Sequence, residues 1–207
     1  GRPLRIISLD GTRGAGKSSQ IAMLSKHFKS LGMDVSTLKM IDGDPIQSGI
    51  IAVEFTEVFL EKHPNGLVIL DGSIARPMVV DIISGMSTPK LLDKFKLLTH
   101  AYERIDHKYS VANFLMVMDD MDECARRIEK FKKLTGRDVQ VIDDVLQERD
   151  IVSGMRFFNN HIASKNIPFQ VIDVDPRHSI MDLNKFIMKK LEEKYEFAKP
   201  KKDDNDW

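Results

Sequence analysis

The sequence predicts an α/β fold in which helices cover both faces of a five-stranded parallel sheet. Three observations support this prediction: short apolar runs alternate with longer segments of helical periodicity, a glycine-rich stretch joins the first run to the first such segment, and no internal repeat interrupts the alternation. Apolar runs are typical of strands buried on both faces, and strands that alternate with helices form parallel sheets. The 207 residues predict one domain over 1–198 and a disordered, charged tail over 199–207.

Five short runs are expected to form the strands. They lie at Leu4–Leu9, Asp34–Ile41, Leu67–Asp71, Ala112–Met118 and Phe169–Val174. The first and third are nearly all apolar, as expected of strands buried on both faces.

Segments between and after these strands have helical features. Apolar residues recur at helical spacing after the glycine-rich stretch until Gly32 ends the first helix. Thr88 is expected to cap a long helix whose first turn holds Pro89. Asp120, with Glu123 three residues later, is a typical helix start. Helices are thus expected over about 21–31, 45–62, 77–84 and 89–109, from 120, over about 141–164 and from 179.

Composition and charge exclude few functions. Lysine and arginine together number 31, as do aspartate and glutamate, so net charge indicates no partner, although a local basic patch can still bind nucleic acid. No apolar run approaches the roughly 20 residues that cross a bilayer, no signal peptide is visible, and the single cysteine, Cys124, cannot form an internal disulfide. We therefore expect a cytoplasmic protein that does not bind membranes. Whether it forms a homodimer is left open.

The stretch LDGTRGAGKSSQ, Leu9–Gln20, predicts a phosphate-binding loop. Gly11, Gly16, Lys17 and Ser18 match the spacing G-x-x-x-x-G-K-S between an apolar strand and an amphipathic helix, the context that this pattern requires. The glycines let backbone N–H groups point at phosphate oxygens, the lysine reaches the β- and γ-phosphates, and the serine hydroxyl binds Mg²⁺. The residues expected to bind nucleotide are Gly11, Thr12, Arg13, Gly14, Ala15, Gly16, Lys17, Ser18 and Ser19.

Further candidates for donor chemistry follow the third and fourth strands. Asp71 ends an apolar strand, where a carboxylate can hold Mg²⁺ through water. Cationic residues crowd the stretch from 126 to 137, and a mobile lid over about 126–140 would bring them onto the transferring phosphoryl group. A planar guanidinium suits phosphate oxygens better than an amine. We therefore assign Arg126 and Arg127 to catalysis, with Lys17, and Arg137 to nucleotide binding.

These motifs resemble those of the thymidylate kinase group of P-loop kinases. The resemblance is carried by LDGTRGAGKSSQ, by Asp44-Pro45 after the second strand, by GLVILD ending at Asp71, and by FLMVMDDMDECARRI, a strand followed by the first arginines of the predicted lid. It covers about residues 4–191 in element order. It implies a P-loop NTPase fold of the nucleotide-kinase type with a mobile lid, Mg·ATP as the phosphoryl donor, and an acceptor bound across the loop.

All departures from that group's pattern lie on the acceptor side. Thymidylate kinases usually carry, within the loop, an acid that contacts the 3′-hydroxyl of the acceptor sugar, whereas this chain has Arg13. They usually follow the third strand with Asp-Arg, whereas the nearest arginine here is Arg76. Two interpretations stay open. Either Arg13 and Arg76 clamp the phosphate of a free thymidine-like nucleotide, or the acceptor is the hydroxyl of 5-hydroxymethyluracil within DNA, which would resemble phage kinases of thymine hypermodification.

Acidic residues that follow the second strand are candidates for a general base that acts on the acceptor. A phosphate acceptor needs little base catalysis, whereas a hydroxyl acceptor benefits from a carboxylate within hydrogen-bond reach. Asp42 and Asp44 stand there, and Asp44-Pro45 resembles the Glu-Pro that supplies the general base in deoxynucleoside kinases. Asp71 is the rival base. Arg13, Asp42, Asp44 and Arg76 are the residues expected to face the acceptor.

One predicted helix carries a group of four polar residues. Tyr102, Arg104, Asp106 and His107 share a predicted helix and are expected to form an exposed polar face rather than to touch an acceptor base.

A P-loop NTPase that acts as a switch and transfers no phosphoryl group is the rival function. The arginines of the predicted lid and the lack of a guanine-reading NKxD stretch argue against that rival.

Overall fold

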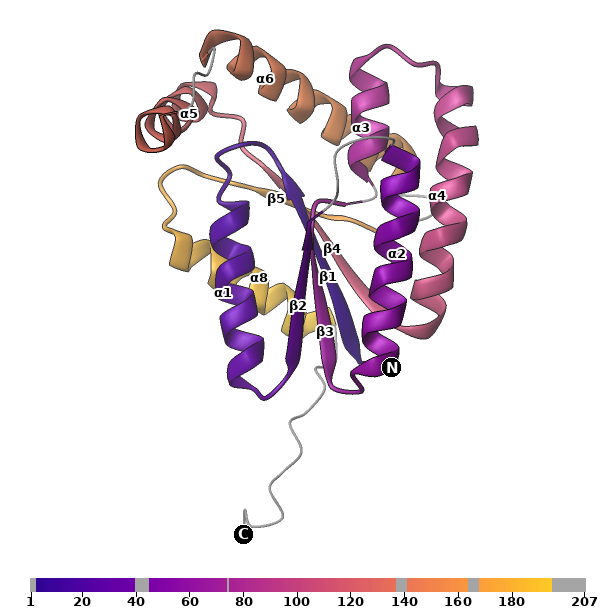
Figure 1. Cartoon of the computed structure of the whole chain (residues 1–207). Helices are drawn as coiled ribbons and strands as arrows, with labels where there is room; N and C mark the ends of the chain where they lie inside the picture. Colours follow the sequence, from indigo (N-terminus) through magenta and orange to yellow (C-terminus); the bar gives the residue numbers. More distant parts are fainter. Residues whose placement is uncertain (1–2, 40–44, 74, 137–140, 164–167, 195–207) are drawn as a thin grey trace.

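The computed structural model describes residues 3–39, 45–73, 75–136, 141–163 and 168–194. Within them, five parallel strands form one sheet in the order β2-β3-β1-β4-β5 (Figure 1). The strands are β1 Leu4–Gly11, β2 Asp34–Lys39, β3 Gly66–Asp71, β4 Ser110–Val117 and β5 Gln170–Asp173. The predicted five-stranded parallel sheet is confirmed, with strand bounds that differ by a few residues.

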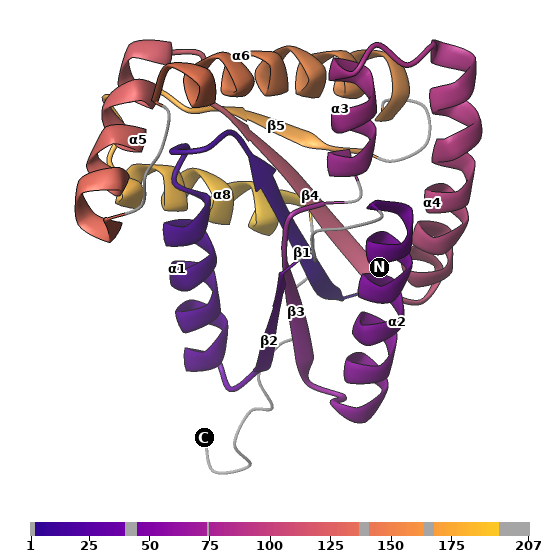
Figure 2. The ribbon, with the colours of Figure 1, turned by 45° about the horizontal axis from the view of Figure 1, so that its top comes forward.

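Helices cover both faces of this sheet. They are α1 Lys17–Ser30, α2 Pro45–Lys62, α3 Ala75–Ile83, α4 Thr88–Lys108, α5 Met121–Thr135, α6 Val141–Phe158 with a π-helical turn η1 at Asn159–Ala163, and α8 Ile180–Lys194. One face carries α1 and α8, and the other carries α2, α3 and α4 (Figure 1). In the view of Figure 2, α6 runs across the carboxyl edge of the sheet from α5 to α3. Among these helices, none is both long and apolar enough to cross a membrane.

Side chains of the strands alternate between two apolar cores, one on each face. In β1, Ile6 packs into the core shared with α2, α3, α4 and α6, whereas Ile7 packs into the core shared with α1, α5 and α8. Both side chains are fully buried. Because successive side chains of a strand point to opposite faces and both faces are covered, β1 places apolar side chains in both cores.

Of the two helix caps predicted from the sequence, one is found in the structure and the other lies one residue earlier than predicted. Asp120 caps α5 by accepting a hydrogen bond from the Glu123 backbone N–H at 3.0 Å, as predicted. In α4 the predicted cap, Thr88, is already the first helical residue, and Ser87 occupies the cap position without a side-chain hydrogen bond. Pro89 in the first turn favours this start, because its fixed φ suits a helix and it needs no N–H partner there.

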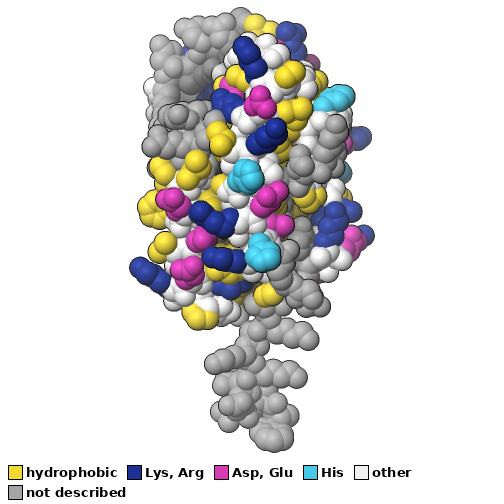
Figure 3. Space-filling model, turned by 90° about the vertical axis from the view of Figure 1, so that its right-hand side faces the viewer, with side chains coloured by type: hydrophobic (Ala, Val, Ile, Leu, Met, Phe, Trp, Pro, Cys, Tyr) yellow, Lys and Arg dark blue, Asp and Glu magenta, His cyan; other side chains and the backbone are white. Residues whose placement is uncertain are grey.

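The right-hand side of the molecule in Figure 1, where α4 lies, mixes charged, histidine and apolar side chains (Figure 3). Arg104 is half exposed there and pairs with Glu57 of α2 at 2.5 Å, which agrees with the predicted polar face. Tyr102 does not agree: it is 4% exposed, and its hydroxyl accepts a hydrogen bond from Asn113 Nδ2 of β4 at 3.0 Å. The predicted exposure of Tyr102 is wrong because a buried amide satisfies the hydroxyl and lets the ring join the core.

Phe158→Ala should lower the free energy of unfolding by about 3–5 kcal/mol. Phe158 is fully buried at the end of α6, and its ring centroid lies 5.7 Å from that of Phe95 and 5.4 Å from that of Phe169, both edge-to-face. Urea denaturation measures the loss. Phe55→Ala is the control, because Phe55 is 61% exposed and its truncation should cost less than about 0.5 kcal/mol. Equal losses in the two variants would contradict this packing.

Candidate active site

The glycine-rich stretch forms a tight turn between β1 and α1. Gly14 and Gly16 have φ values of 79° and 92°, a left-handed backbone that favours glycine. Gly11 lacks a side chain for a different reason: a Cβ there would lie 2.4 Å from the Met116 carbonyl oxygen of β4. Directly behind this turn α1 begins at Lys17, so backbone N–H groups of the first helical turn face the carboxyl edge of the sheet.

A cavity of about 630 Å³ opens over this loop. Its size is usual for small-molecule sites, and α/β sheets bind ligands at the carboxyl ends of their strands. All loop residues predicted to bind nucleotide line it except Ala15, which is buried. The lining residues are Gly11, Thr12, Arg13, Gly14, Gly16, Lys17, Ser18, Ser19, Arg76, Arg127, Lys130, Glu148, Ile151 and Ile180.

Lys17 and Asp71 meet beside this cavity. The Lys17 Nζ lies 3.2 Å from Asp71 Oδ1, and both side chains are partly exposed. The amine is the residue type that binds phosphate oxygens, while the Ser18 hydroxyl and the Asp71 carboxylate are oxygen ligands that suit Mg²⁺, directly or through water. The residues present therefore fit a magnesium–nucleotide.

The buried carboxylate of Asp10 joins the loop to the turn between β3 and α3. Asp10 is 0% exposed and accepts hydrogen bonds from the Gly11 N–H at 2.8 Å, from the Ser73 N–H at 3.0 Å and hydroxyl at 2.9 Å, and from Arg76 Nη2 at 2.7 Å. Asp10 is the main reason that the pKa of Arg76 is raised, so the guanidinium stays charged. Asp10 is not among the predicted site residues, although an acid near the end of an apolar strand is a signal for such a role.

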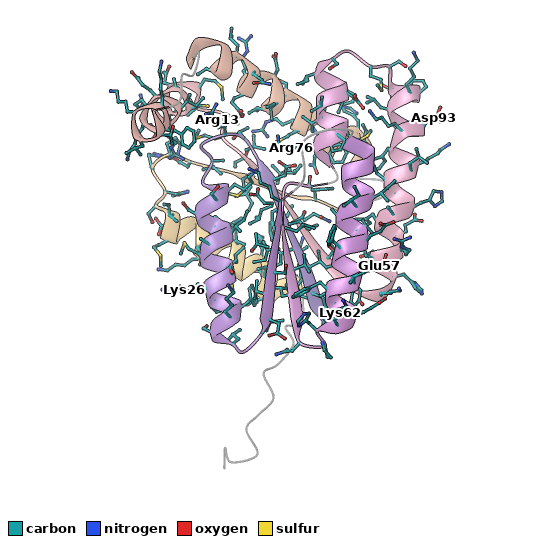
Figure 4. All side chains as sticks on the ribbon, viewed as in Figure 1. Arg13, Lys26, Glu57, Lys62, Arg76 and Asp93 are labelled. Atoms are coloured by element: carbon teal, nitrogen blue, oxygen red, sulfur yellow. The ribbon has the colours of Figure 1, made fainter. Side chains whose placement is uncertain are left out.

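Arg13 turns its side chain toward α5 and its backbone toward α6. The guanidinium carbon lies 5.4 Å from the centroid of the Phe131 ring, and the backbone N–H donates to Glu148 Oε2 at 2.8 Å. Arg76 enters the cavity from α3, so the two arginines lie on different sides of the loop (Figure 4). Both arginines line the same cavity, Arg13 beside α5 and Arg76 on α3.

The two arginines predicted to serve the lid have different places on α5. Arg127 lines the cavity and donates from Nη1 to the Gly14 carbonyl oxygen and from Nε to Glu123 at 3.0 Å. Arg126 is 65% exposed and donates from Nε to the same carboxylate at 2.8 Å. Hydrogen bonds from Arg126 and Arg127 lower the pKa of Glu123, so this acid stays charged and orients both guanidinium groups. Arg127 thus reaches the loop, while Arg126 faces outward.

Several predicted features lie outside the described part of the chain. Asp42 and Asp44 fall within residues 40–44, and Arg137 falls within 137–140. Their roles in acceptor and nucleotide binding stay predictions, as does the disordered tail. The predicted lid overlaps α5, and its mobility also stays a prediction.

Two polar residues near the loop have no predicted role. Glu148 of α6 lines the cavity and is 7% exposed, yet it is 135 positions from Arg13 in the chain, and its charged helix gives no local signal. Gln20 is fully buried and joins α1 to α8: it donates to the Ile180 carbonyl oxygen at 3.0 Å and accepts from Asn184 Nδ2 at 3.2 Å. Its place directly after the loop motif is the signal that could have identified Gln20.

Part of the chain matches known nucleotide kinases. A stretch of 105 residues is 30% identical to the thymidylate kinase of Chlorobaculum parvum, and a match of the same length and identity is found with that of Chlorobaculum tepidum. The chain is similar to thymidylate kinases. The match covers 47% of this chain and 46% and 47% of the two enzymes, so the chain spans about half the length of the curated relatives it matches. No family model matches the sequence.

The fold as a whole is shared with a solved kinase structure. Polyphosphate kinase 2 from Arthrobacter aurescens TC1 aligns with a TM-score of 0.67 over 98% of this chain and 74% of that chain, at 14% sequence identity. At that identity the likeness concerns the fold. It agrees with the predicted α/β fold, in which helices cover both faces of a parallel sheet.

Arg76→Met should lower the free energy of unfolding by about 3 kcal/mol, because it leaves the buried Asp10 carboxylate without its cationic partner. In an Asp10→Asn background the same change should cost much less, since the charge that Arg76 neutralises is already absent. Urea denaturation of the wild type, both single variants and the double variant gives the coupling energy. Equal costs of Arg76→Met in the two backgrounds would show that the pair is not coupled.

Proposed function

We propose that this protein is an ATP-dependent phosphotransferase that moves the γ-phosphoryl group of Mg·ATP to a thymidine-like nucleotide. The observation that carries the proposal is the Lys17–Asp71 pair beside a cavity built on a glycine-rich phosphate loop. The partial match to two thymidylate kinases supports a nucleotide as the acceptor.

Each donor residue has one task in this proposal. Lys17 binds phosphate oxygens and offsets the charge that develops on them during transfer. Backbone N–H groups and the dipole at the start of α1 favour the same anion. Ser18 and Asp71 would hold Mg²⁺, which withdraws charge from phosphate oxygens when bound. The contact between Lys17 and Asp71 keeps both side chains at the loop before nucleotide arrives.

The acceptor is proposed to lie between the loop and Arg76. Arg76 lines the cavity, and its hydrogen bond to the buried Asp10 holds the guanidinium in one orientation. A planar guanidinium suits the oxygens of a nucleoside monophosphate. Asp42 and Asp44 are proposed to face the same acceptor from the segment that follows β2.

A base hydroxyl in DNA is the second candidate acceptor, and the place of Arg13 favours it. The loop position that carries an acid in the thymidylate kinase group holds Arg13, whose side chain lies against Phe131. An acceptor nucleotide within DNA has its 3′-oxygen already esterified, so it needs no acid at this position. In this alternative the phosphoryl group goes to the hydroxyl of 5-hydroxymethyluracil.

A labelling experiment tests the function and distinguishes the two acceptors. The protein is given γ-labelled ATP and Mg²⁺ with either free deoxynucleoside monophosphates or duplex DNA that contains 5-hydroxymethyluracil, with unmodified DNA beside it. We expect label in a nucleoside diphosphate, with thymidine-type acceptors preferred. Label in the modified DNA alone would assign the base hydroxyl instead. Label released as phosphate, with no labelled acceptor in either arm, would contradict a kinase and favour a switch that transfers nothing.

Lys17→Ala should slow transfer by about 10²- to 10³-fold or more, because the charge that develops on the phosphate oxygens loses its amine. Initial rates with labelled ATP measure the loss, and thermal melts followed by circular dichroism show whether the fold is intact. Lys26→Ala is the control: Lys26 lies on α1 well below the loop and should leave the rate unchanged (Figure 4). Full activity of Lys17→Ala would remove this loop from the donor site.

Asp44→Asn separates the two acceptor classes by rate. A hydroxyl must lose its proton on attack, and a positioned carboxylate speeds such a step by about 10²- to 10⁴-fold, so a hydroxyl acceptor should lose rate on that scale. A monophosphate oxygen is already anionic, so transfer to it should change little. The measurement is kcat with each acceptor. A large loss with a free monophosphate would contradict this distinction.

A further inference from the structure

Side chains of α5 and α6 bind the backbone of the phosphate loop at three consecutive peptide groups. Glu148 Oε2 of α6 accepts a hydrogen bond from the Arg13 N–H at 2.8 Å. On α5, Cys124 Sγ donates to the Arg13 carbonyl oxygen at 3.7 Å, and Arg127 Nη1 donates to the Gly14 carbonyl oxygen. The peptide groups that join residues 12–13, 13–14 and 14–15 are therefore each held by one side chain from outside the loop.

A hydrogen bond within the loop adds to these contacts. The Ala15 N–H donates to the Thr12 carbonyl oxygen at 3.1 Å and closes the turn. The first of the three peptide groups is thus held at its carbonyl by Ala15 and at its N–H by Glu148. The third is held at its N–H by Thr12 and at its carbonyl by Arg127. Neither group can rotate without breaking a hydrogen bond.

Two of the three side chains that make these contacts are buried, and the third, Arg127, is 32% exposed. Cys124 is 0% exposed and Glu148 is 7% exposed. Burial and the neighbouring Glu148 raise the pKa of the Cys124 thiol, so the sulfur keeps the proton that it donates. A Cβ at Gly14 would lie 3.3 Å from Arg127 carbons, so α5 packs closely on the loop at this point. Removing one partner of a hydrogen bond at such a partly buried place leaves the other partner unsatisfied, which is costly.

The orientation of these peptide groups determines what the loop offers to an anion. The C=O and N–H of one trans peptide group point in opposite directions. A carbonyl of Arg13 that points outward, to Cys124, therefore directs the Gly14 N–H inward, where successive N–H groups of a phosphate loop form an anion-binding nest. Donors that are already oriented bind charge without reorganising. Side chains that bind the loop backbone thus influence a bound phosphate through the orientation of these peptide groups.

We propose that Glu148 and Arg127 are positioning residues that hold the phosphate loop in its nucleotide-binding conformation. Glu148 acts through the Arg13 N–H and not as a base, and Arg127 acts through the Gly14 carbonyl oxygen instead of meeting the transferred phosphoryl group. The inference rests on the proposed function in one respect, that ATP is the ligand of the loop.

Calorimetric titration of the full chain with Mg·ATP, in the absence of acceptor, tests Glu148. Glu148→Ala should weaken ATP binding by about 10- to 100-fold, because the Arg13 N–H loses a charged partner and its peptide group is freed. Glu148→Gln keeps an oxygen that accepts from this N–H and should bind within about threefold of the wild type. Asp150→Ala is the control: Asp150 is exposed on the same helix and should leave the affinity unchanged.

Arg127→Met tests the second contact. Methionine keeps apolar packing beside Gly14 but cannot donate to its carbonyl oxygen. A positioning role predicts ATP binding about tenfold weaker without acceptor, and a KM for ATP that rises more than kcat falls. An arginine that meets the transferring phosphoryl group would instead lower kcat and leave ATP affinity unchanged, and that result would overturn the assignment of Arg127. Lys133→Met, exposed further along α5, is the control.

Two results would overturn the assignment of Glu148. One is a Glu148→Ala variant that binds ATP as tightly as the wild type. The other is a Glu148→Gln variant that binds ATP normally but loses kcat as fully as Glu148→Ala, because that pattern identifies a base. Thermal melts without nucleotide check folding, and Glu148→Asp, whose side chain is too short for the same contact, replaces Glu148→Ala if the latter is unfolded. Wild-type ATP binding without transfer to any acceptor contradicts the proposed function and leaves this test valid.

Discussion

The buried carboxylate of Asp10 is the group on which the arrangement of the site depends. It lies out of reach of water, so its charge must be satisfied by protein donors, and four of them converge on its two oxygens. These donors come from Gly11 in the phosphate loop and from Ser73 and Arg76 beyond β3. One group at the edge of the sheet therefore fixes the loop relative to the arginine proposed to face the acceptor.

A phosphate loop needs a backbone that can turn sharply and yet keep one shape. Glycines allow the sharp turn, but glycine-rich backbone loses much conformational entropy when it is ordered. Here the ordering comes from side chains that lie outside the loop. Asp10, Glu148 and Arg127 bind its backbone, and Gln20 joins α1 to α8. The glycines of the loop thus allow its sharp turn, and side chains from other parts of the chain hold that turn in one conformation.

Local patterns predicted those features that depend on neighbouring residues in the chain. The strands, the loop between Gly11 and Ser18, and the Asp120 cap follow from hydrophobic periodicity and spacing, whereas the shift of the α4 cap from Thr88 to Ser87 reflects how weakly sequence defines a helix end. Features that depend on distant partners were not predictable. Glu148 looks like any helix acid until α6 crosses the loop, and the burial of Tyr102 depends on an amide in β4.

The hydrogen bonds that shape the loop join residues far apart in the chain. Ser73 is 63 positions from Asp10, Glu148 is 135 from Arg13, and Ile180 is 160 from Gln20. Contacts of such high sequence separation form late in folding, and a chain leaving the ribosome exposes the loop long before its partners exist. A nascent chain that has reached Asp173 contains every strand of the sheet but not α8. The phosphate loop is therefore synthesised before the partners that hold it, and it reaches its final form only after these later segments have packed against it.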